Sequence, residues 1–175
     1  MRISFFLLPA LAACAGAAVA ATSHNSAAPI DFAADHIELQ DKANRAILSG
    51  NVSVKQAEMT LTAARMTVSY TGRVVDGSPQ VSRLDASGGV TVTRPDQVAS
   101  ASYGVYDINR RVIVMLGGVT LNQGGNKVSG SRLTINLDTG KANIDGSGVS
   151  SGTPGTVNTA PGGRVTGRFS VPKRN

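Results

Sequence analysis

Apolar and polar residues alternate along most of the chain after residue 28. Val52 and Val54 stand two residues apart, as do Val90 and Val92, and this period places apolar side chains on one face of a β-strand. Ser, Thr, Asn and Lys fill the positions between them. We find no stretch of helical length with apolar residues at the i, i+3, i+4, i+7 spacing of an amphipathic helix. The pattern predicts an all-β domain.

The alternating runs also repeat. A Gly-x-Val element occurs at 50–52, 88–90 and 117–119, and a weaker copy, Ser-Gly-Val, occurs at 147–149. Upstream of each copy lies a residue pair that begins with Ala or Ser, such as Ala34-Asp35. The spacing from the second residue of this pair to the Val is 17 residues in three copies, as from Asp35 to Val52. In the second copy a turn-rich insertion around 76–79 lengthens it to 25. Such repeats are typical of stacked units that bury their apolar faces against each other. We predict strand–turn units with glycine at the bends.

Stacked antiparallel strands form a sandwich or a rolled sheet, and the first and last strands then have unpaired edges. Charged residues or proline usually protect such edges. The first strand, at 29–32, is short and carries little charge. This composition indicates an edge that is used for pairing.

The first twenty residues have the layout of a secretory signal peptide. Arg2 precedes an apolar, Ala-rich stretch at 3–19, and small residues at 18–20 match the A-x-A cleavage pattern. The stretch is shorter than the roughly 20 apolar residues of a comfortable membrane span, so we expect cleavage near Ala20. Cys14 follows Leu-Ala-Ala, which resembles a lipoprotein lipobox, and a lipid-anchored mature chain is therefore the alternative. Both interpretations place the mature protein outside the cytoplasm.

The net charge of +6 and the pI near 10 are unevenly distributed. Between residues 21 and 152 the chain has 12 Lys and Arg against 11 Asp and Glu, a balance of +1. Four further cations and no acid fall in the Gly-, Ser- and Pro-rich tail. The nearly neutral domain excludes nucleic acid as a partner. We predict a signal peptide at 1–20, a flexible linker at 21–28, the β-domain at 29–145 and a disordered basic tail at 146–175.

The residues that catalysis and metal binding require are scarce. One Cys and two His exclude a Cys/His zinc site, an iron–sulfur site and a disulfide scaffold. Asp35 and His36 are adjacent, but we find no nucleophile elbow, a serine on a sharp turn between a strand and a helix, to pair with them. It also lacks a phosphate loop and an Asp-rich calcium loop. We predict no enzymatic activity and no cofactor.

Five segments of the sequence resemble the OstA-like domain family, and in particular its LptA-type periplasmic lipopolysaccharide-export bridge proteins. They read PIDFAAD at 29–35, AILSGNV at 46–52, LTAARM at 61–66, LGGVTLNQG at 116–124 and VSGSRL at 128–133. The resemblance implies a β-jellyroll of consecutive antiparallel strands that is open at both ends. It also implies head-to-tail oligomers through strand edges, an apolar groove for acyl chains, and partners in the inner- and outer-membrane parts of the export machinery.

The same resemblance, through the P-I-x-F match, assigns acyl-chain contact and subunit pairing to Ile30 and Phe32. Alternation adds further residues that we expect to face inward, and for each of them a purely structural core role is the alternative. These residues are Val52, Val54, Leu61, Met66, Val68, Val90, Val92, Tyr103, Val105, Val119, Leu121, Leu133, Ile135 and Leu137.

The sequence therefore predicts a periplasmic lipopolysaccharide-binding transport protein that bridges the inner and outer membranes. The alternative is a secreted repetitive β-module that binds polysaccharide or a surface protein. Such modules usually present exposed aromatic platforms, for which this chain offers Tyr70, Tyr103 and Tyr106.

Overall fold

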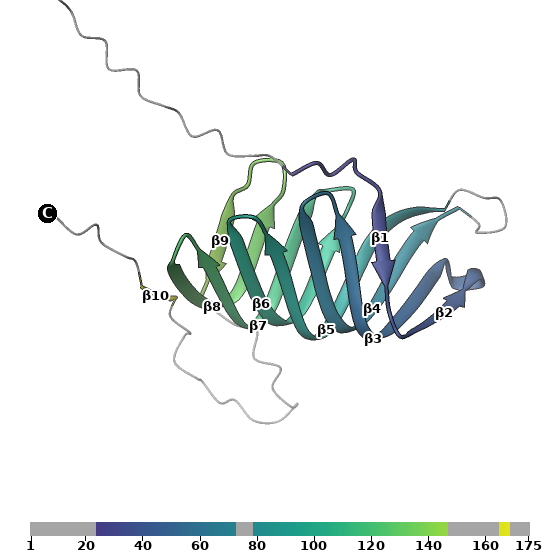
Figure 1. Ribbon diagram of the computed structural model, residues 1–175, viewed down its shortest axis with the longest axis horizontal. Helices are drawn as coiled ribbons and strands as arrows, with labels where there is room; N and C mark the ends of the chain where they lie inside the picture. Colours follow the sequence, from purple (N-terminus) through teal and green to yellow (C-terminus); the bar gives the residue numbers. More distant parts are fainter. Residues whose placement is uncertain (1–23, 73–78, 147–164, 169–175) are drawn as a thin grey trace, which may run out of the picture.

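The computed structural model describes residues 24–72, 79–146 and 165–168, in which the strands form one antiparallel sheet (Figure 1). A short 3-10 helix, η1, spans Asp41–Ala43. The strands are β1 (Ile30–Ala33), β2 (His36–Gln40), β3 (Arg45–Gln56), β4 (Met59–Thr71), β5 (Gln80–Arg94), β6 (Gln97–Asp107), β7 (Val112–Gln123), β8 (Asn126–Asn136), β9 (Ala142–Asp145) and β10 (Thr166–Arg168).

Each long strand from β3 to β8 pairs with the strand that follows it in sequence. At the N-terminal end, β1 and β2 share β3, with Phe32 opposite Val54 and Ile37 opposite Leu48. At the C-terminal end, β9 and β10 likewise share β8. These pairings confirm the prediction of an all-β fold built from consecutive antiparallel strands.

The long strands bend sharply near their middle, where the pairing register shifts. Residues with positive φ lie at the bends of β3, β5 and β7, including Gly88 (82°) and Gly89 (72°). Only glycine adopts such angles without steric cost, so the sequence places the bends. The first three Gly-x-Val elements coincide with them, whereas the copy at 147–149 and most of the 76–79 insertion lie outside the described residues.

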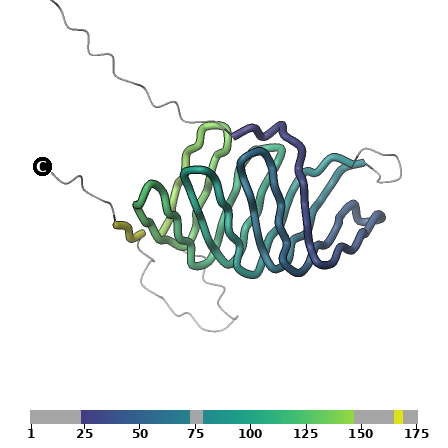
Figure 2. Tube along the Cα trace, in the orientation of Figure 1, coloured from purple at the N-terminus to yellow at the C-terminus, as the bar shows by residue number. Residues whose placement is uncertain are grey.

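The bends fold the sheet onto itself, so that the chain winds as a flattened coil (Figure 2). The two halves of each strand lie in opposite layers, and their inward side chains form one hydrophobic cluster. Twelve residues predicted to face inward are buried there, with at most 6% of their surface exposed. They are Val52, Val54, Leu61, Met66, Val68, Val90, Val92, Val119, Leu121, Leu133, Ile135 and Leu137.

The inward prediction is wrong for Tyr103 and Val105. Tyr103 is 60% exposed, and Val105 lies opposite Asp85 on the outer face. The register shift in β6 is the reason, because Ala101 and Gly104 are both buried although they are three residues apart. The bulge inverts the alternation that holds on each side of it.

The predicted boundaries need two corrections. Within the linker predicted to be flexible at 21–28, residues 24–28 form a turn that is hydrogen-bonded to Gln56. Within the tail predicted to be disordered, Thr166–Arg168 forms β10 and pairs with residues 127–129 of β8. The Gln56 side chain holds the first segment and backbone pairing with β8 holds the second, and the composition of neither segment gives a sign of it.

Candidate functional site

The interior between the two layers is lined almost entirely by aliphatic side chains. Met59, Met66 and Met115 are fully buried among Leu, Ile and Val. Met has three rotatable bonds and a polarisable sulfur, so it adapts to irregular neighbours more readily than branched residues do. The interior therefore combines an apolar surface with side chains that can rearrange around a guest molecule.

This apolar interior is exposed at the N-terminal end of the roll. Phe32, Ile37 and Leu39 are 51%, 42% and 62% exposed, and each lies opposite an inward residue of β3. They face the interior, yet water reaches them because no strand pairs with the outer edge of β1 and β2 in the described residues. Ile30, on the same face, is partly buried against the core. We call Phe32, Ile37 and Leu39 the apolar mouth.

Ile30 and Phe32, to which the resemblance assigns acyl-chain contact and subunit pairing, lie at this end of the roll, and Ile37 and Leu39 join them without a prediction from the sequence. The missed signal is the period-two pattern of HIELQ at 36–40, which is a single short alternation without a repeat partner. The structure brings the two pairs together because β1 and β2 continue one another along β3.

Within the described residues the C-terminal end of the interior is covered, whereas the resemblance implies an opening at both ends. Leu133, Ile135 and Leu137 are at most 1% exposed. Strand β9 covers the edge of β8 beside them, and its residues Ala142 and Ile144 pack against the core. Figure 1 shows β2 and β10 at opposite ends of the roll.

The seam between the free margins of the two layers is held by a buried polar contact. The Tyr106 hydroxyl donates to Gln56 Oε1 at 2.6 Å, and burial raises the pKa of Tyr106. The amide Nε2 of Gln56 donates to the carbonyl oxygens of Ser26 and Ala28, at 3.0 and 3.1 Å. Residues 24–28, which we call the N-terminal strap, are thereby fixed across the seam, where they run along the top of Figure 1 before β1.

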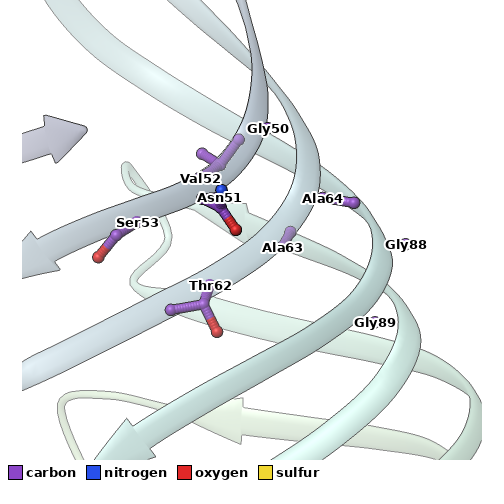
Figure 3. A pocket seen from close by; sticks show the side chains of 9 residues that line it. All are labelled: Gly50, Asn51, Val52, Ser53, Thr62, Ala63, Ala64, Gly88 and Gly89. Carbon is purple, nitrogen blue, oxygen red and sulfur yellow. The ribbon is translucent and has the colours of Figure 1, made fainter. Parts of the chain in front are cut away.

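A hollow of about 460 Å³ lies at the bend of β3, β4 and β5 (Figure 3). It is lined by small residues, among them Ala64, Gly88 and Gly89. Beside it, Asn51 Nδ2 donates to Asp35 Oδ2 at 2.9 Å. A Cβ atom at Gly50 would collide with that carboxylate. We attribute the hollow to the bend itself, with Asp35 as a structural brace.

Other kinds of site receive no support from residues 24–72, 79–146 and 165–168. Within these ranges no three His, Cys, Asp or Glu side chains gather as metal ligands would. No described helix has the length and apolar character needed to cross a membrane.

The geometry defines a class: an antiparallel β-jellyroll with an apolar interior that opens at one end. The family model for the LptA/(LptD N-terminal domain) LPS transport protein matches residues 31–141, and the chain belongs to this family. The family is one of lipopolysaccharide transport, which agrees with the resemblance found in the sequence.

Two individual proteins are similar to this chain. One is the uncharacterized protein R00383 of Rhizobium meliloti (strain 1021), which is 35% identical over 124 residues, or 69% of this chain and 67% of its own length. The other is LptH of Pseudomonas aeruginosa, an LptA-homologous periplasmic component of the lipopolysaccharide transport device. Its crystal structure has a TM-score of 0.67 at 20% identity and covers 85% of this chain and 99% of its own. That likeness shows the shared fold.

Proposed function

We propose that this chain is a periplasmic lipopolysaccharide-binding transport protein. It holds the acyl chains of lipid A in the apolar interior while the lipid passes from the inner to the outer membrane. Its partners in this proposal are the inner- and outer-membrane components of the export machinery. The observation that carries the proposal is the apolar mouth, where inward-facing Phe32, Ile37 and Leu39 are exposed to water.

The energetics favour an acyl chain as the occupant. Moving each CH₂ group out of water contributes about 0.8 kcal/mol, so one acyl chain supplies substantial affinity without any polar contact. The buried Met59, Met66 and Met115 give the interior side chains that can move aside. The affinity then depends on the buried apolar area and not on precisely placed polar contacts. Such binding suits a ligand that must slide onward.

Photo-crosslinking tests the location of the lipid. A photoreactive amino acid replaces Phe32 or Leu39 in the full chain, expressed in cells that export lipopolysaccharide. Tyr103, which is 60% exposed on the outer face, is the matched control. We expect lipopolysaccharide adducts at Phe32 and Leu39 and few at Tyr103. Equal labelling at all three positions, or labelling at Tyr103 alone, would contradict binding through the mouth.

The alternative, a β-module that binds polysaccharide, retains one supporting observation, which is the exposed Tyr103 beside Arg65 on the outer face. Binding of intact lipopolysaccharide is therefore compared with binding of its delipidated sugar. Acyl-chain binding predicts that the sugar alone binds far more weakly. If the sugar binds as tightly as the whole molecule, the polysaccharide module is the better interpretation.

The proposed bridge needs copies that pair end to end. The outer edge of β1 and β2 provides one set of unpaired backbone groups, and the edge formed by β9 and β10 provides the other. Sedimentation velocity over a concentration series tests this pairing. We expect the mass to rise with concentration, and a single-chain mass throughout would contradict self-association.

A further inference from the structure

Three polar or charged residues are buried among the described residues, and all three lie where an inward strand face reaches the seam. Gln56 ends the inward series of β3, Arg94 ends that of β5, and Gln97 begins that of β6. Arg94 is 9% exposed and Gln97 is 6% exposed. Because β5 and β6 are joined by a short turn, Arg94 and Gln97 are direct register partners.

Gln56 and the other two residues differ in their hydrogen bonds. Gln56 donates to two carbonyl oxygens of the strap and accepts from Tyr106. In contrast, Arg94 Nη1 and Gln97 Oε1 are buried and have no hydrogen-bond partner. The ion pairs found among the described residues involve other arginines, all of them exposed. Asp96, in the same turn, is exposed, and its carboxylate accepts from Gln123 Nε2 at 3.5 Å.

A buried guanidinium N–H group without a hydrogen-bond partner is costly. Arginine stays protonated in proteins, and a buried cation is ordinarily matched by a carboxylate or by another anion. Arg94 follows Val90 and Val92 on the inward face of β5, so its charge lies at the margin of the apolar interior. The cationic Arg94 and the acceptor Oε1 of Gln97 together match a ligand that has both an anionic oxygen and a hydrogen-bond donor.

We propose that Arg94 and Gln97 form a headgroup subsite at the seam. Arg94 Nη1 donates to a phosphate oxygen, and Gln97 Oε1 accepts from a hydroxyl or N–H group of the same headgroup. The subsite rests on the proposed function, because the acyl chains in the interior bring the phosphorylated headgroup to the seam. The subsite would bind the charged headgroup, whereas the apolar interior binds the acyl chains.

Binding of two lipids by the full chain tests the subsite. The ligands are lipid A and its fully dephosphorylated form, measured by the same equilibrium assay. A charge-assisted hydrogen bond corresponds to about tenfold in affinity or more, so the wild type should prefer lipid A by at least that factor. Arg94→Gln should abolish the preference by weakening lipid A binding alone. Arg83→Gln, which removes an exposed arginine paired with Asp85 on the outer face, should leave it intact.

Gln97→Glu is a second test variant, and it retains the Arg94 cation. A carboxylate at position 97 pairs with Arg94 internally, so we expect lipid A binding to fall while the melting temperature is maintained or raised. If both variants bind both lipids as the wild type does, the subsite is wrong although the transport proposal stands. If the wild type binds neither lipid, the proposed function itself fails.

Inorganic phosphate distinguishes a headgroup from a free anion. We expect millimolar phosphate to leave the binding of dephosphorylated lipid unchanged and to compete only weakly with lipid A. Tight binding of phosphate alone, lost in Arg94→Gln, would overturn the headgroup assignment in favour of a free-phosphate site.

Discussion

The two ends of the roll are made from the same repeat, yet they treat the apolar interior differently. At the N-terminal end Leu39 is 62% exposed, whereas at the C-terminal end Leu133 and Leu137 are fully buried. The leucines at both ends face inward. The difference is what lies beyond them, since β9 packs over the last long strand while no described strand covers β2. Burial in this fold is therefore decided by neighbours rather than by residue type.

The largest contrast should appear when one leucine is truncated at each end. Leu133→Ala should lower the free energy of unfolding by about 2–5 kcal/mol, because it leaves a cavity in a packed core. Leu39→Ala should change it by no more than about 0.5 kcal/mol, because the side chain is already hydrated. Urea denaturation of the full chain measures both, and equal losses would remove the distinction between the ends.

A second test adds volume instead of removing it. A Cβ at Gly130 meets Ile144 and the backbone oxygen of Asp145 at 2.8 Å, so Gly130→Val should displace β9 and cost about 1–3 kcal/mol. Ala33→Val, on the exposed N-terminal edge, is the matched control and should be near neutral. Thermal unfolding measures the stability of both variants. A neutral Gly130→Val would show that β9 does not close the C-terminal end.

The seam links the two layers, and the hydrogen bond from Tyr106 to Gln56 crosses it. Tyr106→Phe removes the hydrogen bond to Gln56 and should cost about 1 kcal/mol. Burial raises the pKa of Tyr106 in the folded state, so this group's stabilisation is complete below its ordinary pKa of about 10 and is lost as pH rises past it. The variant should therefore lose less stability than the wild type between neutral and strongly alkaline pH.

Burial also raises the pKa of Tyr70, which donates to Asp41. Part of the alkaline loss of stability should therefore persist in Tyr106→Phe and disappear only when Tyr70→Phe is added. Chemical denaturation at several pH values separates the two contributions. An unchanged pH profile in Tyr106→Phe would show that the phenol is not buried in solution.

The smallest effect should follow removal of residues 165–175. Strand β10 pairs with three residues of β8 and all its side chains are exposed, so we expect unfolding to change by less than about 0.5 kcal/mol. Amide hydrogen exchange should nevertheless accelerate at 127–129, while Leu133 and Ile135 stay protected. A large loss of stability would mean that β10, rather than β9, closes the C-terminal end.

Most of the architecture was predictable because each strand half follows a period of two and glycines mark the bends of β3, β5 and β7. The alternation failed at Tyr103 and Val105, where a bulge adds one residue and reverses the facing. Val90, just beyond a bulge, was assigned correctly because Gly88 and Gly89 mark that bend in the sequence. The bend in β6 passes through Ser102 and Tyr103, which have no comparable signature.

The sequence by itself determined the all-β class, the repeat and the apolar side chains of the interior, because these depend on local periodicity and on the backbone freedom of glycine. The tertiary structure alone decided which end of the interior meets water, since that depends on whether a later strand pairs with the edge. It also decided that Gln56 is satisfied while Arg94 and Gln97 are buried without partners. The contacts of Gln56 reach residues 28 to 50 positions away in the sequence, distances over which no local pattern carries information.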